Sequence, residues 1–149
     1  MSSVFSKILV GLDGSDSSLR AVDSAVSVAE KYNSDMILLT IIGTSLKQTT
    51  STFITAPTYS TEELDNEKIA NEKIHEMIKL KYKQINSINS VIVERSASIE
   101  RTIVEYANSE KVDLIIVGSK GRTGIKKILL GSVASAVVAH AHCPVLVIK

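Results

Sequence analysis

The segment from Val117 to Ala134, VGSKGRTGIKKILLGSVA, concentrates glycine and positive charge directly behind an apolar run. It holds four of the seven glycines of the chain, together with Lys120, Arg122 and two further lysines. Glycine lets a backbone approach a ligand closely, and cations beside exposed amides favour an anionic one. The residue types therefore predict a phosphate-binding segment, with a plain strand-to-helix turn as the alternative.

Four positions of this segment have specific expected roles. Gly118 and Gly121 are predicted to turn backbone amides toward the ligand. Gly131 and Ser132 are expected to open a helix, whose first amides lack partners within the helix and whose dipole favours an anion. The hydroxyl of Ser132 could contact phosphate, or it could only cap the helix.

A second polar segment, GLDGSDSS, follows the first apolar run of the chain. Its Asp13 could accept a hydrogen bond from a ribose hydroxyl, or it could be a turn residue, because Asp-Gly pairs are common in turns. Ligands of open α/β sheets bind beyond the carboxyl ends of the strands. If the two apolar runs are neighbouring strands, Asp13 and Gly118 flank one crevice.

Apolar runs and helical spacings alternate along the chain, which predicts β-α-β-α-β-α-β-α-β. Four of the five runs are almost continuously apolar, which is typical of parallel strands covered on both faces. This predicts an open α/β sheet with right-handed crossovers. The expected strands are Lys7–Leu12, Asp35–Ile42, Ser90–Glu94, Asp113–Gly118 and Pro144–Lys149, and the expected helices are 15–32, Ser60–Asn86, Ser98–Glu110 and Gly131–His142. The Ser/Thr-rich stretch Gly43–Thr61 is expected to be a long loop.

Length and composition predict one domain, residues 1–149, in the cytoplasm. The net charge of +1 gives no overall attraction to nucleic acid or to a membrane surface. The apolar runs are too short to span a bilayer, and the N-terminus does not have the pattern of a signal peptide. Cys143 is the only cysteine, so the chain has no internal disulfide and no thiolate metal cluster.

Several motifs of nucleotide-binding and hydrolytic enzymes are missing from the sequence. It contains no G-x-G-x-x-G after the first strand, no G-x-x-x-x-G-K-[ST], no C-x-x-C and no G-x-S-x-G. His75, His140 and His142 are expected to be structural or solvent-facing. No carboxylate or histidine is clearly placed to activate water, so no catalytic or metal-binding residue is predicted.

Gly118-x2-Gly121-x9-Gly131-Ser132, with VGLDGSDSS near the N-terminus and CPVLVIK at the C-terminus, resembles the universal stress protein family over essentially the whole chain. The resemblance implies an open five-stranded parallel sheet of order 3-2-1-4-5 with helices on both faces. This is a Rossmann-like fold of the adenine nucleotide alpha hydrolase type. Members with the complete glycine pattern are usually ATP binders, so the resemblance implies an ATP-binding stress-response regulator.

The resemblance also implies which residues surround the nucleotide. The base and ribose would lie near Asp13, the backbone of Ile41 and Ile42, and Val117 and Gly118. The phosphates, with Mg²⁺ held through them, would lie among Gly121, Gly131, Ser132 and Val133, beside the basic residue Arg122. The last strand, Val145–Ile148, would pair with its copy in a homodimer, which would also cover an apolar sheet edge.

One departure from the family pattern leaves alternatives open. Family members often have Gly-x-Pro after the third strand, whereas Val93–Glu100 reads VERSASIE. The loop after this strand is therefore expected to follow a different path beside the nucleotide. Slow ATP hydrolysis, self-phosphorylation on Ser132 or Thr123, and a nucleotide-free interaction module are the alternative functions.

Overall fold

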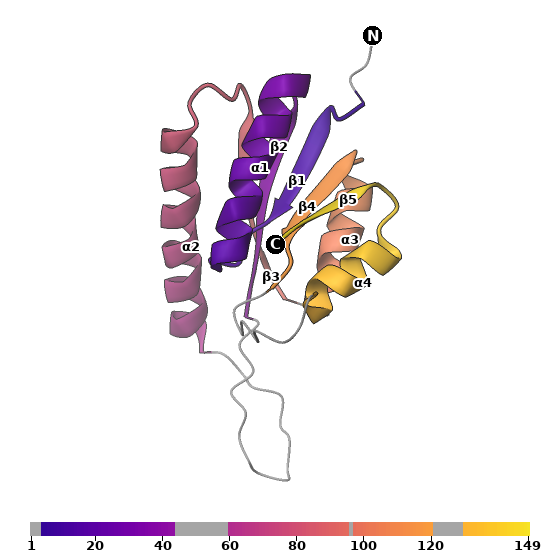
Figure 1. The fold of residues 1–149 in the computed structure, drawn as a ribbon. Helices are drawn as coiled ribbons and strands as arrows, with labels where there is room; N and C mark the ends of the chain where they lie inside the picture. The colour runs from indigo at the N-terminus through magenta and orange to yellow at the C-terminus, as the bar shows by residue number, and fades with distance from the viewer. Residues whose placement is uncertain (1–3, 44–59, 96, 121–129) are drawn as a thin grey trace.

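The protein is described by a computed structural model covering residues 4–43, 60–95, 97–120 and 130–149. Strands and helices alternate along these residues (Figure 1). They are β1 (Lys7–Gly11), α1 (Asp16–Tyr32), β2 (Asp35–Ile42), α2 (Thr61–Lys81), β3 (Ile88–Glu94), α3 (Ile99–Ser109), β4 (Leu114–Gly118), α4 (Ser132–His140) and β5 (Val145–Ile148). The five strands form one parallel sheet of order β3-β2-β1-β4-β5, which confirms the expected topology.

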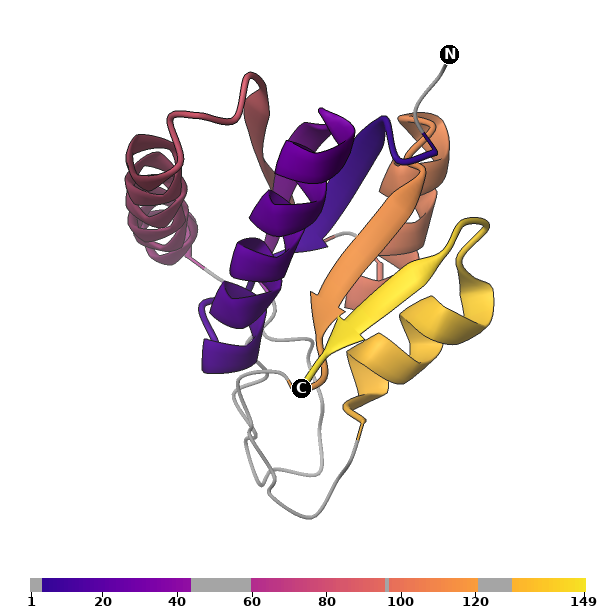
Figure 2. The same ribbon diagram turned by 45° about the horizontal axis from the view of Figure 1, so that its top comes forward.

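Helices cover both faces of the sheet, with α1 and α2 on one side and α3 and α4 on the other (Figure 2). Successive residues of a strand point to opposite faces. Ile8 and Val10 of β1 therefore pack into one core with Val22 of α1. Leu9, between them, packs into the second core with Ile103 of α3. Because both faces are buried, the central strands are apolar at nearly every position.

The strand register brings the ends of β1, β2 and β4 to one edge of the sheet. Val10 of β1 lies opposite Leu38 of β2 and Ile116 of β4. In a parallel sheet each crossover leaves from this carboxyl edge, so all four helices begin there. The segments that the sequence selected for chemistry follow β1 and β4, and their described residues lie at this edge.

The boundary errors of two or more residues lie at the end of α2, at the start of β3, and at the end of α4, which stops at His140 and not at the expected His142. The helix expected to reach Asn86 ends at Lys81, where Tyr82 leaves the helical conformation with φ −115° and ψ 51°. Ile85 lies seven residues after Ile78, which is about two helical turns, and both are buried. The apolar spacing typical of a helix therefore continues past the residue at which α2 ends. Strand β3 begins at Ile88, two residues before the expected Ser90. Asn89 and Ser90 are polar and exposed, so the sequence did not indicate a strand at these positions. The expected loop Gly43–Thr61 falls mostly on 44–59, outside the described residues.

Candidate functional site

The ends of β1 and β4 lie side by side, as the ligand-binding hypothesis required. A Cβ on Gly11 would be 3.3 Å from Cγ1 of Val117, which shows how closely the two strand ends approach. Beyond Gly11, the Leu12 amide donates to the Leu39 carbonyl at 2.9 Å. On the other side, the Ser119 amide donates to the Ile148 carbonyl at 2.7 Å. Asp13 and Gly118 are thus brought to the same edge of the sheet.

Asp13 has the turn role that the sequence left open. Its Oδ1 accepts a hydrogen bond from the Ser15 amide at 2.9 Å. Gly14, between them, has φ +83°, a conformation that favours glycine. Ser15 then caps α1, because its side chain accepts from the Ser18 amide at 3.3 Å. This turn fixes the position of the Asp13 carboxylate, and its contact with ribose stays a prediction.

Gly118 is explained by the approach of α1 to the end of β4. A Cβ at position 118 would lie 2.7 Å from the carbonyl carbon of Ser17 and 2.8 Å from the amide nitrogen of Ser18. The Ser17 hydroxyl also donates to the Lys120 carbonyl at 2.6 Å. Sequence reasoning assigned Gly118 to close ligand approach, but within the described structure its first requirement is helix packing.

The start of α4 is joined directly to the end of β4. The Gly131 amide donates to the Ser119 carbonyl at 2.6 Å. Gly131 is the N-cap of α4, and Ser132 is the first helical residue and is exposed. Of the two roles open for Ser132, capping is therefore wrong. Within the described residues, no side chain caps this helix from the N-cap position.

The apolar residues expected near the nucleotide are mostly buried. Ile41 and Ile42 are 9% and 1% exposed, and Val117 is 4% exposed. Val133 is half-buried and packs against the core beneath α3 and α4. The Ile42 carbonyl already accepts from the Arg95 amide at 3.0 Å. The side chains of these residues can therefore shape the floor of a site, and any polar contacts from these residues must come from their backbone groups.

Gly121 and Arg122 lie outside the described residues, as does Thr123. Their expected roles stay predictions from the sequence. The part of the site that the structure describes consists of the Asp13 turn, the end of β4 and the start of α4.

A buried polar network beside this edge was missed by sequence reasoning. His75 of α2 is fully buried, with Nε2 2.7 Å from Thr40 Oγ1 and Nδ1 2.5 Å from Ser90 Oγ. Burial first, and then the positive charge of Lys79, lower the pKa of His75 to about 4, against a smaller raising effect of Glu76. The sequence left a structural or a solvent-facing role open for His75, and the packing of α2 shows that its side chain points inward.

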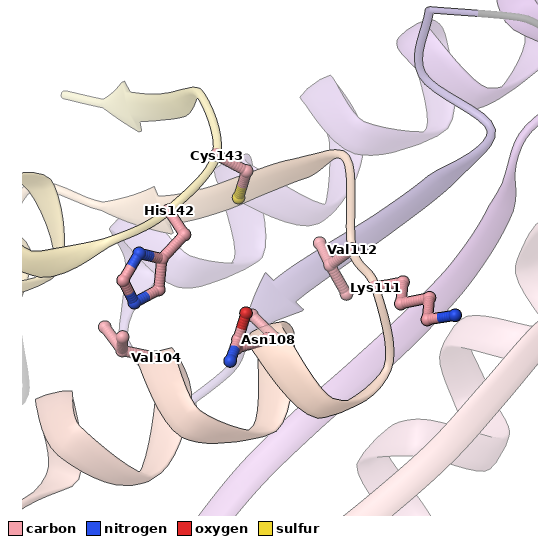
Figure 3. A pocket seen from close by; sticks show the side chains of 7 residues that line it. Val104, Asn108, Lys111, Val112, His142 and Cys143 are labelled. Atoms are coloured by element: carbon pink, nitrogen blue, oxygen red, sulfur yellow. The ribbon is translucent and has the colours of Figure 1, made fainter.

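A small pocket lies at the opposite edge of the sheet, away from the strand ends (Figure 3). Its volume is about 140 Å³, and Val104, Asn108, His142 and Cys143 are among the residues that line it. Burial, followed by the negative charge of Asp113, raises the pKa of the Cys143 thiol. A thiol that stays protonated is a poor nucleophile. This pocket does not belong to the strand-end site.

Two further classes of feature are absent from the described ranges. No group of three or more histidine, cysteine, aspartate or glutamate side chains there could hold a metal ion. None of the helices in those ranges is long and apolar enough to cross a bilayer.

An open parallel sheet of order 3-2-1-4-5, with helices on both faces and polar turns at the carboxyl ends of β1 and β4, defines a doubly wound α/β protein. The chain belongs to the universal stress protein family, whose family model matches residues 5–149.

Known relatives and solved structures agree with this assignment. The chain is 34% identical to universal stress protein MJ0531 of Methanocaldococcus jannaschii over 98% of this chain and 83% of that protein. The universal stress protein UspA structure from Lactobacillus plantarum superposes with a TM-score of 0.82, covering 97% and 98% of the two chains at 23% identity. A universal stress protein crystallised in complex with cAMP has a TM-score of 0.68 at 28% identity, covering 97% of each chain.

Proposed function

We propose that this protein binds an adenine nucleotide, ATP in particular, at the carboxyl ends of β1 and β4, and that occupancy regulates its interactions in a stress response. The observation that carries the proposal is the glycine at the start of α4. This glycine begins a helix beside the end of β4, and within the described residues no cap side chain bonds the first helical amides.

Backbone conformation does not explain why position 131 is glycine. Gly131 has φ −66° and ψ 161°. The serine caps Ser15, Ser60 and Ser98 have nearly the same angles, with φ between −68° and −65° and ψ between 152° and 156°. A serine could adopt the conformation of Gly131 without strain. What glycine removes is the side chain that would occupy the first amides, and a phosphate group can accept those hydrogen bonds instead.

The expected residue roles follow from this placement. Gly131, Ser132 and Val133 supply amides and one hydroxyl to phosphate, and Gly121 and Arg122 are assigned to the same end from the sequence. Asp13 is assigned to ribose, with the backbone of Ile41 and Ile42 toward the base and Val117 and Gly118 beneath the sugar. Mg²⁺ would be held through phosphate oxygens, in keeping with its preference for few protein ligands. A cytoplasmic location is part of this proposal.

The relative crystallised with cAMP supports an adenine nucleotide as the ligand class. Selection of ATP rests on the complete pattern Gly118-x2-Gly121-x9-Gly131-Ser132 of this sequence. The loop after β3 lacks the Gly-x-Pro of many relatives, so contacts to the base are expected to differ while the phosphate end is retained.

A matched pair of aspartate variants tests the proposal. Asp13→Asn keeps the Oδ1 acceptor for the Ser15 amide, so the turn is preserved while the charge and one oxygen are lost. Asp35→Asn makes the same change at an exposed residue at the opposite edge of the sheet. We expect calorimetric titration with Mg-ATP to show about tenfold weaker binding for Asp13→Asn and unchanged binding for Asp35→Asn. Absence of binding by the wild-type protein at millimolar ATP would instead favour the nucleotide-free interaction module.

We also propose a homodimer formed through β5. This strand lies at one end of the sheet order, and its Leu146 is 39% exposed although it is apolar. Pairing of Val145–Ile148 with its copy would satisfy the outer edge of the strand and cover this side chain. Sedimentation of the wild-type protein and of Leu146→Arg checks this, and a monomeric wild-type protein at all concentrations would contradict it.

A further inference from the structure

The buried network around His75 ends on the backbone of the Asp13 turn. Thr40 of β2 donates its hydroxyl hydrogen to the Leu12 carbonyl at 2.8 Å. The same oxygen lies 2.7 Å from Nε2 of His75. Thr40 is 1% exposed and Leu12 is 3% exposed, so water does not compete for these groups. The network therefore connects α2 to the peptide that leads into Asp13.

Hydrogen bonding assigns the protons of this network. A threonine hydroxyl carries one hydrogen, and that hydrogen is used on the Leu12 carbonyl. Thr40 Oγ1 must then accept from His75, so Nε2 carries the imidazole proton. In the neutral ring Nδ1 is an acceptor, and it receives the hydroxyl hydrogen of Ser90 at 2.5 Å. All these groups are satisfied by neutral His75 in the Nε2–H tautomer.

The carbonyl that Thr40 holds belongs to the peptide plane shared by Leu12 and Asp13. Fixing this oxygen fixes the direction in which the chain leaves β1. The Asp13 amide lies in the same plane and donates to Ser18 Oγ of α1 at 3.4 Å. The Leu12 carbonyl thus has an internal partner on the core side, and the Asp13 amide has one on the α1 side.

We propose that His75 and Thr40 are positioning residues for the nucleotide site, holding the Leu12–Asp13 peptide and with it the turn that places the Asp13 carboxylate. This inference rests on the proposed nucleotide binding. His75 acts through Thr40, and neither side chain contacts the ligand. The imidazole orients the threonine hydroxyl, and the hydroxyl orients the peptide.

Two substitutions of Thr40 separate the hydroxyl from the volume of the side chain. Thr40→Val keeps the shape and removes the hydroxyl, whereas Thr40→Ser keeps the hydroxyl and removes a methyl group. We expect Mg-ATP to bind roughly fivefold to tenfold more weakly to Thr40→Val and within about twofold of wild type to Thr40→Ser. A role in packing alone would give the opposite order, because valine fills the site better than serine.

Substitutions of His75 and of its Nδ1 partner Ser90 complete the test. His75→Gln can still donate toward Thr40 and should retain most of the affinity, whereas His75→Leu should resemble Thr40→Val. Ser90→Ala is the control, because it removes the Nδ1 partner without touching the Leu12 carbonyl, and it should bind like wild type. Thermal unfolding followed by circular dichroism verifies that each variant is folded at the titration temperature.

The outcomes distinguish the two proposals. Wild-type binding together with equal affinities of Thr40→Val and Thr40→Ser would overturn the positioning role and leave nucleotide binding intact. Weakening of Ser90→Ala to the level of Thr40→Val would also overturn it, since the effect would then not depend on the Leu12 carbonyl. No binding of ATP by the wild-type chain would refute both proposals.

Discussion

Helices α1, α2 and α3 each begin with a serine whose side chain accepts a hydrogen bond from the first turn, whereas α4 begins with glycine. The three serine-capped helices also carry acidic residues in their first turns, and the first turn of α4 carries none. A carboxylate near a helix N-terminus is stabilised by the dipole and repels other anions. The helix starts at the carboxyl edge are therefore built in two ways, and only that of α4 favours an outside anion.

This difference teaches that capping and ligand binding compete for the same backbone groups. The first amides of a helix donate to one set of acceptors, which belong either to a side chain or to a ligand. In α1 those amides are used internally by Ser15, and its Ser17 is bonded to the Lys120 carbonyl. The start of α1 serves as a rigid wall, and under the proposed function phosphate would bind at the start of α4.

The largest expected effect comes from Gly118→Ala, which tests whether the α1 start is a rigid wall. The added Cβ would meet the backbone of Ser17 and Ser18 at 2.7 to 2.8 Å, and backbone cannot move aside cheaply. We expect a loss of about 3 kcal/mol or more in the free energy of unfolding, measured by urea denaturation.

Gly11→Ala is the matched control for this prediction. Its Cβ would meet side chains alone, that of Val117 at 3.3 Å and that of Ile103 at 3.9 Å, and we expect a change within about 1 kcal/mol. Equal stability of the two variants would show that α1 can shift away from β4. The start of α1 would then not be a rigid wall, and it would no longer differ from the start of α4 in this respect.

The second prediction concerns acid, which should weaken the region held by His75. The pKa of His75 is lowered from 6.5 to about 4 in the folded protein, so between these values the unfolded chain binds a proton that the folded protein does not. Stability is therefore highest above pH 6.5, falls as the pH drops toward 4, and loses no more from this group below that. Because the Ser90 side of the network is only partly buried, water screens part of the effect. We expect a loss of about 2 kcal/mol in the free energy of unfolding.

This is measured as the difference in unfolding free energy between wild type and His75→Gln across pH 7 to 4. The comparison with the variant removes the contribution of carboxylates, which titrate in both proteins. His142→Gln, at an exposed residue, is the control and should keep the pH dependence of wild type. If His75→Gln also keeps it, the histidine already takes up its proton in the folded state and the assigned tautomer is wrong.

The third prediction concerns a variant in which α4, like the other three helices, begins with a side chain that caps it. Aspartate can adopt the backbone angles of Gly131 and accept from the free amides, so Gly131→Asp should raise the free energy of unfolding by about 0.5 to 1 kcal/mol. The same carboxylate would repel phosphate, and we expect at least a roughly tenfold loss of ATP affinity. A rise in the free energy of unfolding together with a loss of ATP affinity would confirm that the first amides of α4 bind the nucleotide.

Ser98→Asp places the same charge at the capped start of α3 and serves as the control. It should leave ATP affinity unchanged, because the amides of α3 are already used by the residue it replaces. A loss of affinity equal to that of Gly131→Asp would mean that charge anywhere along the edge suffices, and the distinction between the two kinds of helix start would be lost.

The alternating pattern of apolar runs and helical spacings was enough to predict the elements and a parallel sheet, whereas the strand order came from the family resemblance. The larger errors fell at α2, where Ile85 continues a helical spacing after the helix has ended, at β3, where the polar Asn89 and Ser90 follow Ile88, and at the end of α4. These are peripheral elements, exposed on one side, so their sequences are less constrained by burial. The central strands gave no such error because both of their faces are covered.

The glycine-rich segments and the Asp13 turn were visible in the sequence because glycine and Asp-Gly pairs have strong local preferences. The reason for Gly118 was not visible, since it depends on the distance between α1 and the end of β4, which no local pattern encodes. His75 was equally hidden, because a histidine among charged residues on a helix faces solvent or core depending on how the helix is rotated. The conformational preferences of turns depend on neighbouring residues, so the sequence determines them. Close approach and burial depend on packing between elements far apart in the chain, so only the tertiary structure decides them.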